Sequence, residues 1–346
     1  MRVLRLSALV MLAALASGPA FAQAAAPAGK GGPPREMSPE VKADSDAQRA
    51  LAKATPALAM ERVLIKVTGA PFPIADISAM TQDKQGNIYL FHRPEDKAGT
   101  DAVVVVDANG KFLRSWGKGM FTMPHGIRVD PDGNVWTVDA NKSIVVKFTN
   151  DGKKLLQIDV GDVPDPSRAF CGATDVTFAK NGHVFLADGY CNARYIEYDA
   201  AGKKLRQWGS KGKGNGEFVI PHDLSVNADN TVMYIADREN GRLQWFDMEG
   251  KYLGQKHFGG QLFSAVVAPD GMVYVGTRAR GPDARNVDSD SVIFKYDPKA
   301  DKVVGQLNAF AHQISVGADG SVLPGAVTVR VGGYPKDTIL VFRAKK

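Results

Sequence analysis

Short apolar segments, separated by turns that contain glycine, recur from about residue 60 to the end of the chain. Brief apolar runs between turn residues are typical of β-strands and predict an all-β domain. One turn-and-strand motif occurs six times, in QGNIYL (85–90), PDGNVWTVD (131–139), KNGHVFLAD (180–188), ADNTVMYIAD (228–237), PDGMVYVG (269–276) and ADGSVLPGA (318–326). A second hairpin follows most copies, so each repeat holds about four strands, the content of one propeller blade. The pattern predicts a six-bladed β-propeller.

The two ends of the repeat region complete the sixth blade. The last repeat stops after the strand 338–343, and the segment 62–69 before the first repeat resembles an outermost strand. We expect these strands to pair and to close the ring, because the pairing covers two otherwise exposed strand edges. The propeller domain is expected to span 59–346. A pair of β-sandwiches is the structural alternative, but it gives no reason for six equal units.

The first 22 residues predict a secretory signal peptide. Arg2 and Arg5 precede an apolar run from Leu6 to Ala16, and the small residues Ala20 and Ala22 mark a cleavage site after Ala22. The run is too short to cross a membrane. We therefore expect an exported protein, secreted or periplasmic, with no membrane span.

Residues 23–58 separate this leader from the repeats. They are rich in Ala, Pro, Gly and Lys, and we expect them to form a flexible or weakly helical tether. The stretch 39–54 could form a helix, but it has no clear apolar face.

Composition limits the range of functions. The chain has 346 residues, of which 44% are hydrophobic and 23% charged, enough to bury a large core. Its net charge of +6 includes Arg2 and Arg5, and its basic residues are not clustered as a nucleic-acid module requires. We therefore expect no nucleic-acid partner, and the sequence identifies no protein partner. Two cysteines exclude a disulfide-dense domain and a four-thiolate metal site.

The register of the repeats brings three histidines together. The repeat anchors are Gly86, Gly133, Gly182, Asn230, Gly271 and Gly320, which lie 41 to 49 residues apart. Counting eight residues back from each anchor reaches the start of each innermost strand, at Ser78, His125, Thr174, His222, Phe263 and His312. Alternate blades of a six-fold ring are about 120° apart, so the imidazoles of blades two, four and six should converge on the channel axis. Three imidazoles and an open fourth position favour a catalytic zinc ion, although copper, iron and manganese also accept this ligand type.

Loops that return to the same end of the channel contain further candidates. The loops 91–96, 188–194 and 237–242 hold Arg93, Tyr190 and Arg238. Two guanidiniums suit a carboxylate, and a tyrosine beside a cation can act as a base. A salt bridge with Asp237 is the simpler alternative for Arg238, and a packing role is the simpler one for Tyr190.

The register also bears on the two cysteines and on the other three histidines. Cys171 and Cys191 fall at the same end of blade three, so an exported chain could join them in a disulfide, the alternative being two buried thiols. The other three histidines fall outside the register and are interpreted as surface or turn residues: His92, His183 and His257.

These motifs resemble the catalytic core of the peptidyl-α-hydroxyglycine α-amidating lyases, within the NHL-repeat propellers. The resemblance covers about residues 62–343 and is strongest in FHR (91–93), MPHGI (123–127), FCGATDV (170–176), DGYCNAR (188–194), VIPHDL (219–224) and ADRENGR (236–242). It implies that His125, His222 and His312 bind zinc and that Tyr190, Arg93 and Arg238 are the active-site residues. It also implies a Cys171–Cys191 disulfide and a structural calcium held by the backbone carbonyls of Met80 and Ile127.

The sixth blade departs from the family pattern. Where the family has Met-Pro-His-Asp, this chain has Phe310-Ala311-His312-Gln313, which removes an acidic residue and changes the pocket wall. The segment LPGA (323–326) also lacks the usual aspartate. We expect these changes to affect which substrate is bound and how fast it reacts. The zinc site should be retained, because all three histidines are present.

The sequence leaves three functional hypotheses. The leading one is a zinc-dependent lyase that cleaves the N–C bond of an N-acyl- or peptidyl-α-hydroxyglycine to an amide and glyoxylate. The second is a binding or scaffold propeller with a structural metal, because the fold alone does not determine function. The third is a metal-dependent hydrolase or lactonase, a class whose channel ligands are usually acidic and amide groups rather than histidines.

Overall fold

The structure, a computed structural model, describes residues 37–163, 165, 168, 170–280, 290–325 and 337–345. These residues belong to one compact unit, Glu36–Lys346. The expected signal peptide and the first part of the expected tether lie outside the described residues.

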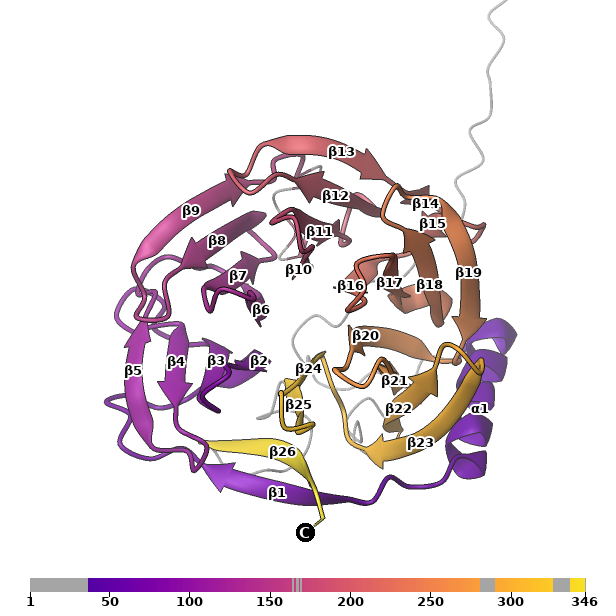
Figure 1. Ribbon diagram of the computed structural model, residues 1–346, viewed down its shortest axis with the longest axis horizontal. Helices are drawn as coiled ribbons and strands as arrows, with labels where there is room; N and C mark the ends of the chain where they lie inside the picture. The colour runs from indigo at the N-terminus through magenta and orange to yellow at the C-terminus, as the bar shows by residue number, and fades with distance from the viewer. Residues whose placement is uncertain are drawn as a thin grey trace, which may run out of the picture. The chain divides into compact units, whose positions relative to one another are not determined.

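Six four-stranded antiparallel sheets surround a central channel, so the prediction of a six-bladed β-propeller is confirmed (Figure 1). Blades one to three consist of β2(Asp76–Gln82), β3(Ile88–Arg93), β4(Val103–Val106), β5(Phe112–Trp116), β6(Pro124–Val129), β7(Val135–Asp139), β8(Ile144–Phe148), β9(Lys154–Asp159), β10(Asp175–Phe178), β11(Val184–Asp188), β12(Arg194–Tyr198) and β13(Lys204–Trp208). Blades four and five consist of β16(Pro221–Val226), β17(Val232–Asp237), β18(Arg242–Asp247), β19(Tyr252–His257), β20(Gln261–Val267), β21(Val273–Arg278), β22(Ser291–Asp297) and β23(Lys302–Asn308). A short parallel pair, β14(Ser210–Lys211) and β15(Glu217–Phe218), and the 3₁₀ helix η1(Arg238–Asn240) lie in loops around blade four.

Blade six combines strands from both ends of the described chain. Its order is β24(Gln313–Val316), β25(Val322–Gly325), β26(Thr338–Ala344) and β1(Met60–Lys66). Strands β1 and β26 pair antiparallel along their whole length, from Met60 opposite Ala344 to Lys66 opposite Thr338. The expected pairing is therefore present, but the N-terminal strand begins two residues earlier than the segment 62–69.

Burial decreases from the channel to the rim of each blade. The second strand of a blade, such as β7 or β11, is buried at every position, while an outermost strand such as β9 is mostly exposed. Each outermost strand exposes one large apolar residue to solvent, namely Leu64, Leu113, Leu155, Leu205, Leu253 and Val304. This gradient explains why the inner strands are continuous apolar runs in the sequence, since both of their faces pack against neighbouring blades.

The repeat anchor is a turn residue with a left-handed backbone. Gly133 has φ of 87°, and in the same turn Asp130 accepts hydrogen bonds from the backbone N–H groups of Asp132 and Asn134. In blade four the anchor is Asn230, with φ of 59°. Asparagine adopts a left-handed backbone more readily than most other residues with a side chain, so the same turn forms with Asn230 in place of glycine.

Part of the expected tether is a helix that packs on the propeller. Helix α1(Pro39–Ala54) begins after the N-cap residue Ser38 and lies at the rim beside blades four and five (Figure 1). Its contacts are both apolar and polar, and Leu51 and Ala52 pack against the core of blades four and five. Gln48 is buried and donates from Nε2 to Thr277 Oγ1 at 3.1 Å, and Ser45 Oγ accepts from the backbone N–H of Arg280 at 3.0 Å. Neither helix in the described part of the chain is long and apolar enough to cross a membrane.

The buried polar contacts of α1 can be tested by a pair of substitutions. We expect Gln48→Ala to lower the free energy of unfolding by about 1–3 kcal/mol, because it removes a buried hydrogen-bond partner of Thr277. The control is Lys42→Ala on the same helix, which removes only an exposed ion pair with Asp46 and should cost less than about 1 kcal/mol. Urea denaturation of both variants measures the difference, and equal costs would contradict the docked position of α1.

Candidate metal centre and active site

In four of the six blades the innermost strand has a β-bulge at the position that the repeat register singles out. In blade two, Pro124 pairs with Asp139 and Gly126 with Val138, so His125 between them has no residue opposite it. Blades one, four and five show the same shift. In blade six, Gly325 is the strand partner of Gln313, and its carbonyl also accepts a hydrogen bond from the N–H of His312. Two consecutive residues therefore face one residue there, as they do in a bulge. A bulge redirects the side chain of the extra residue, and here it allows the three histidines to leave the sheet pattern and converge.

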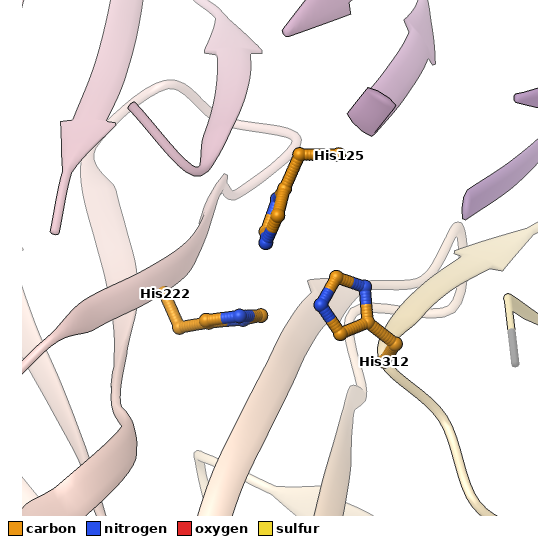
Figure 2. Close-up of side chains that lie close together, drawn as sticks. All are labelled: His125, His222 and His312. Carbon is orange, nitrogen blue, oxygen red and sulfur yellow. The ribbon is translucent and has the colours of Figure 1, made fainter. Parts of the chain in front are cut away.

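The three histidines meet in the channel. They come from blades two, four and six, and all three are buried. Candidate ligand nitrogens of His125, His222 and His312 all lie within 4.8 Å of one another, and the ring centroids are 4.5–4.9 Å apart. Figure 2 shows the three rings converging on a common point.

The neighbouring blades hold the rings in one tautomer. The Nδ1 atoms of His125, His222 and His312 bond to the backbone carbonyls of Thr174, Phe263 and Ser78, at 2.6, 2.7 and 2.9 Å. These three acceptors are the register residues of blades three, five and one. A carbonyl only accepts, so each Nδ1 has the proton and each Nε2 keeps the lone pair that a metal requires.

Burial keeps the histidines neutral. It lowers the pKa of His125 and of His222 well below the usual value, with further lowering from the neighbouring His312. The pKa of His312 falls to about 3, first through burial and then through the charge of Arg93. Neutral imidazole is the form that binds metal, so the site has this form at physiological pH.

The donor set fits a single divalent cation. Zinc binds imidazole nitrogen at about 2.0–2.1 Å, and shifts of about 1 Å would bring the three Nε2 atoms to that distance. Three protein ligands leave a fourth position open. Imidazole nitrogens also suit copper, iron and manganese to differing degrees, so the donor set alone does not select the metal.

Tyr190 lies directly beside the three rings. Its Oη is 2.8 Å from Nε2 of His125 and 3.1 Å from Nε2 of His222. Its loop is tied down by the disulfide between Cys171 and Cys191, which confirms the predicted bridge. Burial raises the pKa of Tyr190, while the charges of Arg238 and Arg93 oppose that rise.

The two arginines come from different blades, and the charges of both act on Tyr190. Arg238 begins η1, is buried, and places its guanidinium 5.5 Å from the ring centre of Tyr190 and 5.3 Å from that of Phe263. Arg93 ends β3 and donates from Nε to the carbonyl of Pro124 at 2.8 Å. The charges of both arginines act on Tyr190 and the histidines, so the structure brings all six expected zinc-site and active-site residues into one region.

Glu239 lies beside the site and was not singled out by the sequence analysis. Its Oε1 accepts from Arg238 Nε at 2.8 Å and from Gln261 Nε2 at 2.8 Å, and its Oε2 pairs with Arg280. Burial raises the pKa of Glu239, but the two arginines outweigh burial and keep the pKa below its usual value. The alternative partner for Arg238, Asp237, pairs instead with Arg242 at 2.8 Å. Glu239 directly follows Arg238 in the sequence, which was the one available signal.

The interpretation of His92 as a surface or turn residue was wrong. Its side chain is fully buried in β3, where Nδ1 accepts from the N–H of Ala75 and Nε2 donates to the carbonyl of Asp101 at 2.7 Å. Its ring stacks on Phe72. The second strand of a blade packs on both faces, so even a polar residue there is buried and must find partners.

The residues implied to hold calcium do not fit that ion here. Met80 and Ile127 lie on β2 and β6, two residues beyond the bulges. Calcium takes six to eight oxygen ligands and usually needs carboxylates. The acidic residue of the family pattern is Gln313 in this chain, and its Oε1 accepts from the N–H of Ile127 at 3.4 Å. The channel acids next to it, Asp175 and Asp223, are bound by an arginine.

Aromatic side chains surround the histidine site. Phe263 and Phe310 pack edge to face with ring centres 5.3 Å apart, and Phe263 also contacts His222. Phe170 packs on Tyr190 with ring centres 5.2 Å apart. The position where this chain departs from the family, Phe310, is therefore part of the wall around the site.

Comparisons with known proteins agree with this architecture. Residues 170–274 match a family described as a 6-bladed β-propeller, and residues 121–148 match the NHL repeat. Among solved structures, the virginiamycin B lyase from Staphylococcus aureus with quinupristin aligns with a TM-score of 0.56 at 13% identity, over 82% of this chain and 99% of that one. A streptogramin B lyase structure aligns with a TM-score of 0.53 at 15% identity, over 82% and 98%. At such identities the likeness shows the fold alone.

Curated relatives are more similar in sequence. The probable peptidyl-α-hydroxyglycine α-amidating lyase of Caenorhabditis elegans is 34% identical, over 54% of this chain and 59% of its own length. The peptidyl-glycine α-amidating monooxygenase B of Xenopus laevis is 32% identical, over 74% and 33%. The peptidyl-α-hydroxyglycine α-amidating lyase 2 of Drosophila melanogaster is 29% identical, over 71% and 67%.

The match covers less than two thirds of the first two of these relatives. Several of the matched proteins are nevertheless named for the same lyase activity. This chain also matches a family described as a 6-bladed β-propeller. The chain is therefore a six-bladed propeller with an NHL repeat, and it is similar in sequence to curated proteins that are named peptidyl-α-hydroxyglycine α-amidating lyases.

Proposed function

We propose that this chain is a zinc-dependent lyase that converts an N-acyl- or peptidyl-α-hydroxyglycine to an amide and glyoxylate. The main support is one arrangement: three buried imidazoles with their Nε2 atoms gathered around one point, and the hydroxyl of Tyr190 in contact with two of them. The names of the curated relatives give independent support. The predicted leader and the disulfide also support export from the cytoplasm.

The proposed substrate is a carbinolamide, in which one carbon bears both the hydroxyl and the amide nitrogen. Cleavage removes the hydroxyl proton, forms the aldehyde of glyoxylate, breaks the C–N bond and delivers a proton to the departing amide nitrogen. A zinc ion held by His125, His222 and His312 would supply Lewis acidity that lowers the pKa of the substrate hydroxyl. Tyr190 would accept the hydroxyl proton as a phenolate, because its Oη lies beside Nε2 of His125 and His222, where a bound cation, together with Arg238 and Arg93, would lower its pKa.

The two arginines would bind and orient the substrate carboxylate. Arg93 and Arg238 face the site from different loops, and guanidinium groups bind carboxylates through paired hydrogen bonds. Glu239 accepts from the Nε of Arg238, so this ion pair does not use the terminal nitrogens that a carboxylate would need. Fixing the carboxylate in this way sets the position of the hydroxyl relative to Tyr190 Oη and accounts for part of the rate enhancement.

The aromatic wall would contact the acyl part of the substrate. Phe263 and Phe310 are both buried next to the histidines, and Phe263 lies under the guanidinium of Arg238. An apolar wall excludes water and strengthens the electrostatic contacts within the site. The acyl group would therefore lie against these rings while the carboxylate faces the arginines.

Metal content is the first test of this proposal. We expect the chain, purified without a nickel column, to contain about one zinc ion per molecule by mass spectrometry, since three imidazoles form a complete protein ligand set for zinc. His222→Ala should remove most of this zinc because it removes one ligand. His257→Ala is the matched control, since His257 is exposed at the end of β19 and outside the channel. Equal zinc loss in both variants, or no bound metal in the unaltered chain, would exclude the proposed site.

Turnover tests the role of Tyr190. With α-hydroxyhippurate as substrate, we expect glyoxylate formation, and Tyr190→Phe should lower the rate by about 100- to 10,000-fold, the usual contribution of a general base. Zinc content should not change. The control is Tyr252→Phe on the outermost strand β19, which should retain full activity. Unchanged turnover in Tyr190→Phe would remove this residue from the mechanism, and zinc without glyoxylate would indicate another substrate or a binding role.

A further inference from the structure

A second polar layer occupies the channel below the three histidines. Its members are buried side chains contributed by five blades, and all but the arginine directly follow a register residue: Arg128, Asp175, Asp223, Ser264 and Gln313. Arg128 lies on β6, three residues after His125. This group is outside the proposed reaction, because its side chains bond to one another and to the backbone of β24.

Arg128 connects blade two with three other blades. Its Nε and Nη2 donate to Oδ2 of Asp175 at 3.1 and 2.5 Å, and Nη2 also donates to Oδ1 of Asp223 at 2.7 Å. Its Nη1 donates to the backbone carbonyl of Ile314 at 2.6 Å and reaches Ser315 Oγ at 3.3 Å. The guanidinium therefore binds acceptors in blades three, four and six and neutralises charge at the centre of the ring.

The two carboxylates have donors on every oxygen. Oδ1 of Asp175 accepts from Gln313 Nε2 at 2.7 Å, and Oδ2 of Asp223 accepts from the hydroxyl of Ser264. The remaining oxygen of each acid is held by Arg128. A calcium ion in this layer would have to displace these donors, and it would lie close to a guanidinium that stays charged at every physiological pH.

We propose that the guanidinium of Arg128 takes the structural place of the divalent cation that the family resemblance implies in this channel, so that the propeller needs no calcium. Arg128 directly follows Ile127, one of the residues whose carbonyl was expected to hold the ion. Gln313, which replaces the expected acid, completes the arrangement by bridging Asp175 and the backbone of Ile127. The inference concerns the scaffold and does not depend on the proposed lyase activity.

The unaltered chain gives the first test. The protein is stripped of loosely bound ions, reloaded with zinc, and melted in calcium-free buffer and in millimolar calcium chloride. We expect no calcium at stoichiometric level by mass spectrometry and the same Tm in both buffers. One calcium ion per chain together with a lower Tm after its removal would overturn the proposal.

Substitution of Arg128 gives the second test. Arg128→Met should lower the Tm by about 5–15 °C, because it leaves two buried carboxylates without their cation. The matched control is Arg343→Met, which removes an arginine that bonds only at the surface, to the carbonyl of Ala108, and should change the Tm little. A loss in Arg128→Met no larger than in this control would overturn the proposal.

A double variant separates charge balance from packing. Adding Asp223→Asn to Arg128→Met removes one uncompensated carboxylate at nearly constant volume. The double variant should regain part of the Tm that the single variant loses. A double variant less stable than Arg128→Met would show that Arg128 acts by filling space rather than by neutralising the acids, and would contradict the proposal.

Discussion

The site depends on the hydrogen bond between each imidazole Nδ1 and a carbonyl of the next blade. Bulges release His125 and His222 from the sheet pattern, and His312 lies just before the first residue of β24, but neither feature fixes the rotation of a side chain. The carbonyls of Thr174, Phe263 and Ser78 fix the rotation and the tautomer. Blades with histidine thus alternate with blades that orient it, and the six-fold ring becomes a threefold ligand set.

Below the histidines, the channel contains a second layer in which charged side chains are buried. Two aspartates in a dry interior need positive charge, and Arg128 supplies it within hydrogen-bonding distance of both. The histidine layer above is neutral because its burial lowers the pKa of each ring. Separate layers for the neutral imidazoles and for the fixed charges keep the histidines apart from the ion pairs that Arg128 makes with Asp175 and Asp223.

The sequence was most informative where the fold repeats. Six anchors at nearly constant spacing predict the blade number, and counting back from them identifies His125, His222 and His312, which the structure brings together. The loops with Arg93, Tyr190 and Arg238 followed from the same register. The docking of α1 could not be predicted, because only Leu51 and Ala52 supply its apolar contact to the core. Its other contacts are polar bonds such as Gln48 to Thr277, so no apolar periodicity marks the buried face. The partners of Arg128 come from three other blades, and no local pattern reports such a contact.

The mixed origin of blade six has a consequence for biosynthesis. His312 belongs to a sheet whose outer strands, β26 and β1, come from opposite ends of the domain. During translation β1 emerges before the rest of the propeller and can pair only once β26 has been made. The sheet that carries His312 is therefore completed late, and the three imidazoles can assemble only after almost the whole propeller has been synthesised.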